Sequence, residues 1–307
     1  MTNKFLITVI GPTAIGKTAL SLKLAQHFQC EIISCDSRQF FKEMYIGTAV
    51  PEPEELAAAK HHFIQDKSIF EPCSVGDFEK EAIEKLDELF ENNDFAVLVG
   101  GSGLYVDAIL KGFDDFPDVP EMVRKEVSVK FEQHGIGYLH EELQQRDPDY
   151  FSVVDIGNPQ RMMRALEICI ASGLPYSTFL HQKKNVRNFT PIIVGLEAER
   201  QTIYDRINHR VDLMMNAGLL EEAEKLYPHK TLNALQTVGY RELFAYFDGD
   251  FTLDFAIAEI KKNTRRFAKR QLTWFKHTEN AKWFDFNESS EAIICYIEST
   301  LKKIIAK

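Results

Sequence analysis

Residues 11–18 read GPTAIGKT, a glycine-rich loop that ends in Lys-Thr. In the pattern G-x-x-x-x-G-K-[ST], backbone N–H groups surround a phosphate, and the helix that follows adds its dipole. We expect Lys17 to contact phosphate oxygens and Thr18 to offer its hydroxyl to Mg²⁺. This first glycine-rich loop therefore predicts a polyphosphate site, and it leaves open which polyphosphate binds, ATP included. Its residues are Gly11, Pro12, Thr13, Ala14, Ile15, Gly16, Lys17 and Thr18.

A carboxylate that could act beside this loop is harder to place. In P-loop ATPases and kinases, a later apolar strand ends in an Asp that holds Mg²⁺. Here the apolar run FAVLV is followed by Gly100-Gly101-Ser102-Gly103, the second glycine-rich loop, which contains no acid. The nearest acid at a strand end is Asp36, in SCDSRQF. Asp36 could be a metal ligand, a general base, or the N-cap of the next element.

Basic residues are concentrated in one segment of an acidic chain. The formal net charge is −10, which taken alone argues against a nucleic-acid partner. The segment KKNTRRFAKRQLTWFKH (261–277) holds seven Lys and Arg and no acid, and without those seven, 29 basic residues stand against 46 acidic ones. We expect a helix with Ile260, Phe267 and Trp274 on its buried stripe. A solvated basic face is the ordinary alternative, but this distribution favours contact with nucleic acid.

A second polar surface is expected on NPQRMMRALEI (158–168). Asn158 and Pro159 are suited to the N-cap and first position of a helix. Gln160, Arg161 and Arg164 then share one exposed side, because they are three or four residues apart. Residues expected in the core are Met162, Met163, Leu166 and Ile168.

The elements that must position these residues alternate between strand and helix. Predicted strands are 4–10, 31–34, 191–196, 282–286, and the run 95–103, which continues into a glycine-rich turn. Predicted helices are 17–28, 77–92 with Asp77 as N-cap, 199–227, 237–248 and 252–278. This alternation predicts an α/β fold with a parallel sheet flanked by helices and a ligand site at the carboxyl ends of its strands. Residues 113–190 read instead as an all-helical insertion, with helices at 120–134, 138–146 and 159–172. The predicted domains are thus a core of 1–112 with 191–307, and the insertion 113–190.

Composition sets the broad class. The chain has 307 residues, of which 45% are hydrophobic and 27% charged, in the ordinary range of soluble globular proteins. Its five cysteines form no CxxC pair, which argues for a reducing compartment and against a structural zinc site. No apolar run is long enough to span a membrane, so we expect a cytoplasmic protein without a membrane partner. The histidines His61, His62, His134 and His140 lack metal-ligand spacing and are interpreted as structural.

Eight motifs together resemble one known family. In order they are GPTAIGKT, CDSRQ, IGTAVP (46–51), HHFI (61–64), VGGSGLY (99–105), NPQRMMRALEI, VGYREL (238–243) and TRRFAKRQLTWF (264–275). From about residue 5 to residue 285 the chain closely resembles the tRNA dimethylallyltransferases, also called tRNA isopentenyltransferases, in their shorter bacterial form. The resemblance implies a P-loop NTPase-like fold and transfer of a dimethylallyl group from dimethylallyl diphosphate to N6 of the adenosine 3′ of the tRNA anticodon, with Mg²⁺ as cofactor. We expect the enzyme to act as a monomer.

The same resemblance assigns roles to single residues. It implies that Asp36 is the general base, that Lys17 and Ser102 act in catalysis, and that Arg210 adds a cation; by sequence alone Arg210 could equally be a solvated helix arginine. Ser102 stands where the family more often has Thr, and Arg38 where a small or apolar residue is expected. The implied tRNA contacts are Asp36, Ser37, Arg38, Gln39, Ser102, Arg124, Gln160, Arg161, Arg164, Gly239, Tyr240, Arg241, Arg265, Arg266, Lys269 and Arg270.

Three other functions remain compatible with parts of the sequence. A small-molecule P-loop kinase would use the first glycine-rich loop and Asp36, and would transfer phosphate from ATP. A prenyltransferase acting on free AMP would not need the helical insertion or the basic segment. A non-catalytic RNA-binding protein would not need Lys17, Thr18 and Asp36 together.

Overall fold

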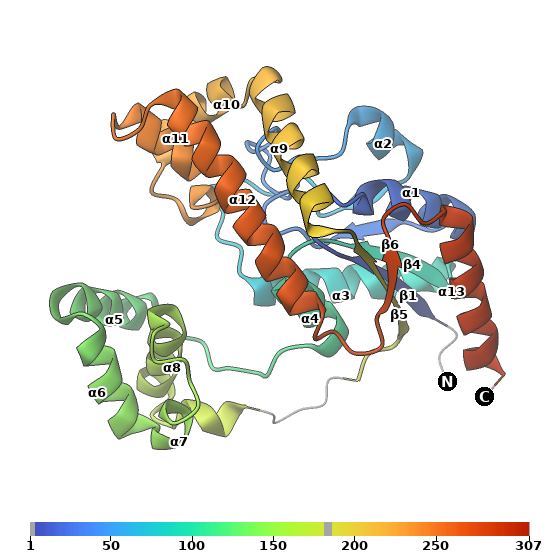
Figure 1. Cartoon of the computed structure of the whole chain (residues 1–307). Helices are drawn as coiled ribbons and strands as arrows, with labels where there is room; N and C mark the ends of the chain where they lie inside the picture. The colour runs from blue at the N-terminus through green and yellow to red at the C-terminus, as the bar shows by residue number, and fades with distance from the viewer. Residues whose placement is uncertain (1–3, 181–185, 307) are drawn as a thin grey trace. The chain divides into compact units, whose positions relative to one another are not determined.

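The computed structural model describes residues 4–180 and 186–306. The chain divides into two compact units, one formed by Met1–Leu110 with Arg187–Lys307 and the other by Lys111–Val186 (Figure 1). The sequence analysis predicts the boundaries of the helical insertion within a few residues of these, at 113 and 190.

The first unit is built on a six-stranded sheet in the order β3-β2-β4-β1-β5-β6, and every neighbouring pair is parallel. The strands are β1 (Phe5–Ile10), β2 (Ile32–Ser34), β3 (His61–His62), β4 (Phe95–Val99), β5 (Thr190–Glu197) and β6 (Lys282–Asp285). The predicted α/β fold with a parallel sheet is confirmed. Strand β3 was not predicted, because two residues carry no measurable alternation. Since β2, β4 and β1 are neighbours, the segments that follow them start side by side at one edge of the sheet.

The strand register brings these three segments to the same level. Val99 is the partner of Val9 on one side and of Ser34 on the other. The N–H of Cys35 donates to the carbonyl of Val99 at 2.8 Å. A Cβ on Gly100 would lie 2.4 Å from Cys35 Sγ, so only glycine permits this approach. The segment after β2 is therefore packed directly against the second glycine-rich loop.

Alternating side chains of β1 divide the core into two layers. Phe5, Ile7 and Val9 pack on one face of the sheet with α1 (Lys17–Phe28), α9 (Arg200–Asn216) and α13 (Ser290–Ile305). Leu6 and Ile10 pack on the other face with α3 (Val75–Asn92) and α4 (Gly103–Lys111). Figure 1 shows these helices on the two sides of the sheet.

A third cluster of helices extends the first unit beyond the sheet. It contains α10 (Leu219–Leu226), α11 (Tyr240–Phe247) and α12 (Leu253–Phe275), packed with the end of α9. The short elements α2 (Pro53–Ala58), η2 (Tyr227–His229) and η3 (Asn233–Leu235) complete the unit. The single helix predicted over 199–227 is two helices, α9 and α10, because Gly218 adopts φ +100° and ends the regular backbone. Helices α2, α4 and α13 were not predicted.

Two sequence predictions about helix faces and caps are wrong. The N-cap of α3 is Ser74, whose hydroxyl accepts the N–H of Asp77, and the Asp77 carboxylate bonds back to Ser74 in a capping box. On α12, Phe267 and Trp274 are 38% and 40% exposed instead of buried. The buried stripe consists of Ala256, Ile260, Ala268, Gln271 and Phe275. It was missed because its central members are a small residue and a polar one.

The second unit is helical. Its elements are α5 (Glu121–His134), α6 (Ile136–Arg146), α7 (Pro148–Phe151), α8 (Pro159–Ser172) and η1 (Tyr176–Phe179). Its core joins Val127 of α5, Leu139 and Leu143 of α6, and Met162 and Leu166 of α8. The predicted start of α8 is confirmed, since the side chain of Asn158 accepts the N–H of Arg161 at 3.2 Å and Pro159 is the first helical residue.

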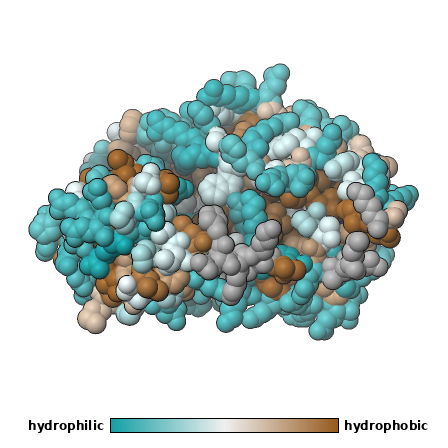
Figure 2. Space-filling model, turned by 90° about the horizontal axis from the view of Figure 1, so that it is seen from below, coloured by the Kyte–Doolittle hydropathy of each residue, from teal (hydrophilic) through white to brown (hydrophobic). Residues whose placement is uncertain are grey.

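A helix that spans a membrane must be both long and apolar. Within residues 4–180 and 186–306, no helix is both long and apolar enough to cross a bilayer. On the face shown in Figure 2, hydrophilic side chains predominate and apolar ones occur in separate patches.

Candidate active site

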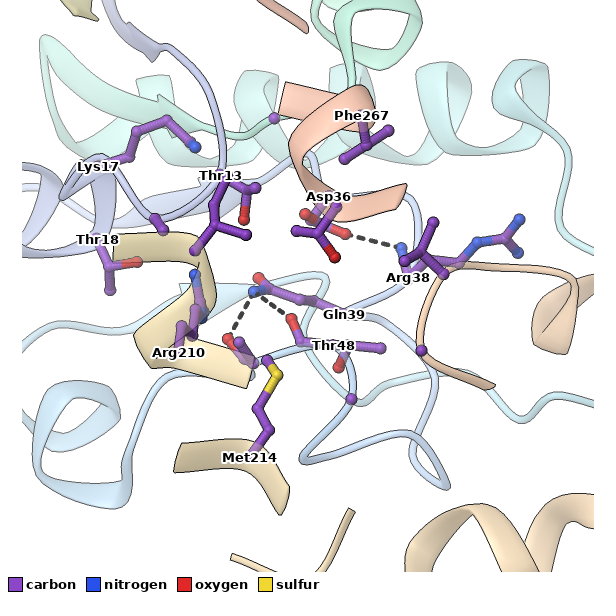
Figure 3. A pocket seen from close by; sticks show the side chains of 18 of the residues that line it. Thr13, Lys17, Thr18, Asp36, Arg38, Gln39, Thr48, Arg210, Met214 and Phe267 are labelled. Atoms are coloured by element: carbon purple, nitrogen blue, oxygen red, sulfur yellow. Dashed lines mark hydrogen bonds between the residues drawn. The ribbon is translucent and has the colours of Figure 1, made fainter. Parts of the chain in front are cut away.

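A cavity of about 730 Å³ lies in the first unit, at the carboxyl ends of its central strands. Both glycine-rich loops contribute to its wall, as do residues 36–39 after β2, part of the loop 47–51, and the facing sides of α9 and α12. In Figure 3, Lys17, Thr18 and Arg210 lie on one side of this pocket and Asp36 near its centre. The parallel sheet thus gathers residues that are far apart in the sequence.

The first glycine-rich loop has the backbone of an anion site. Gly11 has φ +148°, and a Cβ there would lie 2.7 Å from the carbonyl oxygen of Leu196, so glycine is required for the turn out of β1. The N-cap of α1 is Gly16, which has no side chain to accept the free N–H groups, and no acid is present in the first turn. Those N–H groups and the helix dipole are therefore available to a bound phosphate.

Two cations converge on the same place. Lys17 Nζ donates to the carbonyl of Pro12 at 2.8 Å. The pKa of Lys17 is lowered to about 8, mainly because the side chain is buried; the carboxylate of Asp36 opposes this shift and the positive charge of Arg210 adds to it. Burial also lowers the pKa of Arg210, which Asp36 again raises. Two partly desolvated cations at one place favour the binding of an anion there.

A third cation was missed by the sequence analysis. Arg206 lies one turn before Arg210 on α9, and its Nε donates to the carbonyl of Ala14 at 2.7 Å. Ala14 has φ +62°, a backbone conformation that is uncommon for alanine. Arg206 thus supports the strained residue of the first glycine-rich loop. The spacing of four residues between the two arginines was the available signal, because such residues share a helix face.

The side chain of Asp36 accepts a backbone N–H of the turn after β2 and also lines the pocket. Its Oδ1 accepts the N–H of Arg38 at 3.0 Å, an Asx turn that fixes the carboxylate (Figure 3). The same side chain lines the cavity and interacts electrostatically with Lys17 and Arg210. No group of three or more His, Cys, Asp or Glu suited to a metal occurs among the described residues. The turn therefore holds the Asp36 carboxylate at the pocket, near the two cations.

Ser102 links the second glycine-rich loop to the segment after β2. Its Oγ accepts the N–H of Ser37 at 3.1 Å and donates to Ser37 Oγ at 3.1 Å. Both serines line the cavity. The Ser102 hydroxyl therefore contacts the residue that directly follows Asp36.

Gln39 and Arg38 hold neighbouring segments in place. The side-chain amide of Gln39 donates to the carbonyls of Thr48 and Ala49, at 3.2 and 2.9 Å (Figure 3). Arg38 Nη1 donates to the carbonyl of Asn233 at 3.1 Å, and burial lowers its pKa. The side chain that departs from the family pattern is therefore directed at the loop before α11.

Tyr240 does not have the surface position that the resemblance implied. It is 0% exposed, and its hydroxyl donates to Glu222 at 2.7 Å. The Glu222 carboxylate also accepts the N–H groups of Tyr45, Ile46 and Gly47, at 3.0, 2.8 and 2.9 Å. The assignment of Tyr240 to tRNA contact is corrected for this reason. Its ring and hydroxyl hold the wall of the pocket that begins at Gly47.

The basic surface of α12 is narrower than its sequence indicates. Arg266, Lys269 and Arg270 are exposed, whereas Arg265 is partly buried, with Nη1 donating to Asn208 at 2.7 Å. Three further lysines pair with acids, as Lys261–Asp212, Lys262–Glu259 and Lys276–Glu197. Arg241, at the start of α11, is exposed and lines the cavity together with Gly239 and Arg270.

The remaining predicted contacts belong to the second unit. Arg124 is exposed on α5, and Gln160, Arg161 and Arg164 are exposed on α8, as their spacing predicted. Arg164 Nη1 lies 3.6 Å from Glu167 Oε2.

Apolar side chains close other parts of the pocket. Met214 of α9 and Phe267 of α12 line it on opposite sides of Asp36 in Figure 3. Leu219, Val238 and Ile260 add to this wall. Neither Met214 nor Phe267 was assigned to the site from the sequence, because apolar residues at helical spacing are indistinguishable from core.

A six-stranded parallel sheet with a glycine-rich loop between β1 and α1 at its carboxyl edge defines an α/β protein. The model of the family described as "IPP transferase" matches residues 39–278. A protein named tRNA dimethylallyltransferase from Flavobacterium johnsoniae is 67% identical over 308 residues, covering 98% of this chain and 100% of that protein. A protein of the same name from Flavobacterium psychrophilum is 62% identical, and the match covers 97% of this chain and 99% of that protein. The crystal structure of a tRNA isopentenylpyrophosphate transferase from Bacillus halodurans is 37% identical, with TM-score 0.73, covering 98% and 97%. The chain belongs to the IPP transferase family.

Proposed function

We propose that this protein transfers the dimethylallyl group of dimethylallyl diphosphate to N6 of the adenosine 3′ of the anticodon in tRNA. The observation that carries this proposal is that one cavity combines an anion site, an oriented carboxylate and an apolar wall. A prenyl diphosphate needs the first and third of these features, and an amine nucleophile needs the second. The names of the relatives from Flavobacterium support the same reaction.

The reaction breaks the allylic C–O bond and forms a C–N bond to the exocyclic amine. Negative charge builds on the leaving diphosphate, and the backbone N–H groups of the first glycine-rich loop, Lys17 and Arg210 would stabilise it. The lone pair of the adenine amine is delocalised into the ring, so the amine is a weak nucleophile. Asp36 accepts its proton as the new bond forms.

The apolar wall has a chemical purpose in this reaction. An allylic group that is leaving its diphosphate can be captured by water as well as by the amine. Met214, Phe267 and Ile260 line the pocket and would exclude water around the hydrocarbon chain. Electrostatic stabilisation by the cations is also stronger where water is excluded.

Mg²⁺ fits the donors that this site offers. It prefers oxygen ligands and keeps several waters or substrate oxygens. Thr18, at the start of α1, lines the cavity and would supply a hydroxyl, and the diphosphate would supply the other oxygens. When bound, the ion neutralises charge on the diphosphate.

RNA recognition would use the exposed cations. Arg266, Lys269 and Arg270 on α12, and Arg161 and Arg164 on α8, are available to phosphates. The target adenine must leave the stack of its loop to reach a buried carboxylate. Tyrosine and other base-stacking side chains are common in such pockets, and here Phe267 offers a partly exposed ring. We expect the enzyme to act as a monomer in the cytoplasm.

A small-molecule kinase is disfavoured by the second glycine-rich loop. The position after β4 at which kinases and ATPases hold Mg²⁺ with an Asp is occupied by Gly100-Gly101-Ser102-Gly103. Without that carboxylate, the first glycine-rich loop is better suited to a leaving diphosphate than to ATP.

The test is to incubate the protein with dimethylallyl diphosphate, Mg²⁺ and an unmodified anticodon stem–loop, and to weigh the RNA by mass spectrometry. The expected result is a gain of one dimethylallyl group. AMP and ATP are the comparison substrates: prenylated AMP would favour the free-nucleotide enzyme, and phosphate transfer from ATP would favour the kinase. An unchanged RNA mass would refute the proposal.

A further inference from the structure

Gln271 is the polar member of the buried stripe of α12, and both the oxygen and the nitrogen of its side-chain amide form hydrogen bonds. It is 5% exposed. Its Oε1 accepts the N–H of Thr13 in the first glycine-rich loop at 2.8 Å. Its Nε2 donates to the carbonyl of Gly101 in the second glycine-rich loop at 2.7 Å. One side chain thus connects two loops that leave different strands.

The chemistry of these partners requires an amide at this position. One partner is a backbone donor and the other a backbone acceptor, so the side chain must accept and donate at once. A carboxylate could accept from Thr13 but would face the carbonyl of Gly101 without a proton to donate. A methionine of similar volume would remove both hydrogen bonds, and the carbonyl of Gly101, whose bond is buried, would lose its partner at a cost in free energy.

The contact with Gly101 lies close to Lys17, one cation of the pocket. A Cβ built on Gly101 would lie 2.4 Å from Gln271 Nε2 and 3.7 Å from Lys17 Nζ. Trp274 packs equally closely against Gly103 of the same loop, since a Cβ on Gly103 would lie 2.4 Å from Trp274 Cδ1. The Nε1 of Trp274 donates to Asp107 at 2.8 Å. Two residues three apart on α12 therefore set the position of the second glycine-rich loop.

We propose that Gln271 is a positioning residue of this active site, and that its amide fixes the two glycine-rich loops relative to each other so that both face one diphosphate. The inference rests on the proposed function for the identity of the substrate. Gln271 itself does not touch the reacting atoms. It acts through two backbone groups. The N–H of Thr13 fixes the position of the first glycine-rich loop, and the carbonyl of Gly101 fixes the position of the neighbouring Ser102.

The first test uses Gln271→Glu, Gln271→Met and, as a matched control, Thr273→Ala. Thr273 is exposed, and its hydroxyl donates to the carbonyl of Lys269 on its own helix at 3.0 Å. At pH 8 we expect kcat/KM for the prenyl donor to fall by about 30- to 100-fold in both Gln271 variants, because small displacements in an active site have effects of this order. Thr273→Ala should equal wild type.

The pH profile separates positioning from general packing. A protonated carboxyl donates through its O–H and accepts through its C=O, so at low pH Gln271→Glu regains both hydrogen bonds. Burial disfavours the charged form and assists this protonation. The activity of Gln271→Glu relative to wild type should rise as the pH falls, whereas that of Gln271→Met should not change. Parallel profiles for the two variants would overturn the proposal.

A double-mutant cycle provides the second test and needs no prenyl transfer. The probe is inorganic diphosphate, and its affinity is measured by titration calorimetry. Gly101→Ala should weaken binding about tenfold in the wild-type background, because the new methyl group meets the Gln271 amide. In the Gln271→Ala background, Gly101→Ala should lower the affinity for diphosphate by less than about twofold. Additive losses would refute the assigned role. If the wild type binds diphosphate but does not prenylate RNA, the proposed function fails while this cycle still decides the role of Gln271.

Discussion

Replacing Asp36 with Asn tests the proposed general base while keeping the shape of the side chain. The amide oxygen of Asn can still accept the N–H of Arg38, which Asp36 Oδ1 accepts at 3.0 Å, so the turn after β2 is retained. The amide cannot take the proton of the adenine amine. Loss of a general base typically costs about 10²- to 10⁴-fold in rate, equivalent to about 3–5 kcal/mol in the barrier. We expect kcat to fall by that amount and RNA affinity to remain within about threefold of wild type.

The choice of pH matters for this experiment. The carboxylate of Asp36 raises the pKa of Lys17, so its removal lowers that pKa further below about 8. Above the new pKa, a loss of charge on Lys17 would add to the loss of the base. Single-turnover rates should therefore be measured near pH 6.5, where Lys17 stays protonated, with RNA affinity from fluorescence anisotropy.

The matched control is Asp205→Asn, an exposed Asp on α9 whose Oδ1 bonds to Gln201. It should leave both quantities unchanged. Turnover of Asp36→Asn within about threefold of wild type would show that Asp36 is not the base. An equal loss in RNA affinity and rate would show that it acts in binding.

Three other predictions follow from the site. Because the pKa of Lys17 is about 8 in the free protein, the cationic form is lost as the pH rises through that value; diphosphate affinity should fall about tenfold per pH unit above it, and a Lys17→Met variant should show no such slope. Tyr240→Phe removes only a buried hydrogen bond; it should lower the free energy of unfolding in urea by about 1 kcal/mol without changing RNA affinity, and an affinity loss above threefold would restore Tyr240 to the RNA surface. Arg266→Ala and Arg270→Ala should each reduce the salt dependence of RNA binding by about one unit of slope; an unchanged slope would remove this face of α12 from the interface.

The fold could be predicted because its signals are local. Short β-branched runs that end at glycine, such as 4–10 and 95–99, define the sheet, and the helical spacing of 159–172 defines α8. The end of α9 at Ala217-Gly218 was missed because one glycine inside a long periodic segment is also compatible with a continuous helix.

Site residues could likewise be predicted only where they belong to local sequence motifs. Lys17, Asp36 and Ser102 could be proposed from motifs, since they follow strands that are adjacent in a parallel sheet. Gln271 and Glu222 could not, because each acts on backbone groups more than a hundred residues away in the chain. Such partners leave no trace in spacing or periodicity.

The exposed aromatic residues of α12 show how tertiary structure overrides composition. Phe267 and Trp274 are large and apolar, so their spacing indicated the buried stripe. The helix instead packs through Ala268 and Gln271, which bring its backbone close to the two glycine-rich loops. The aromatic rings are thereby left at the rim of the pocket and over Gly103.

The central claim is that the first glycine-rich loop holds the leaving diphosphate of a prenyl donor whose hydrocarbon goes to one adenosine. The most direct measurement follows diphosphate release and RNA modification together, on a stem–loop with adenosine 3′ of the anticodon and on a copy with guanosine there. We predict one diphosphate released per prenyl group gained, and a digest that places the group on that adenosine. Modification of the guanosine copy, or diphosphate release without RNA modification, would contradict the account.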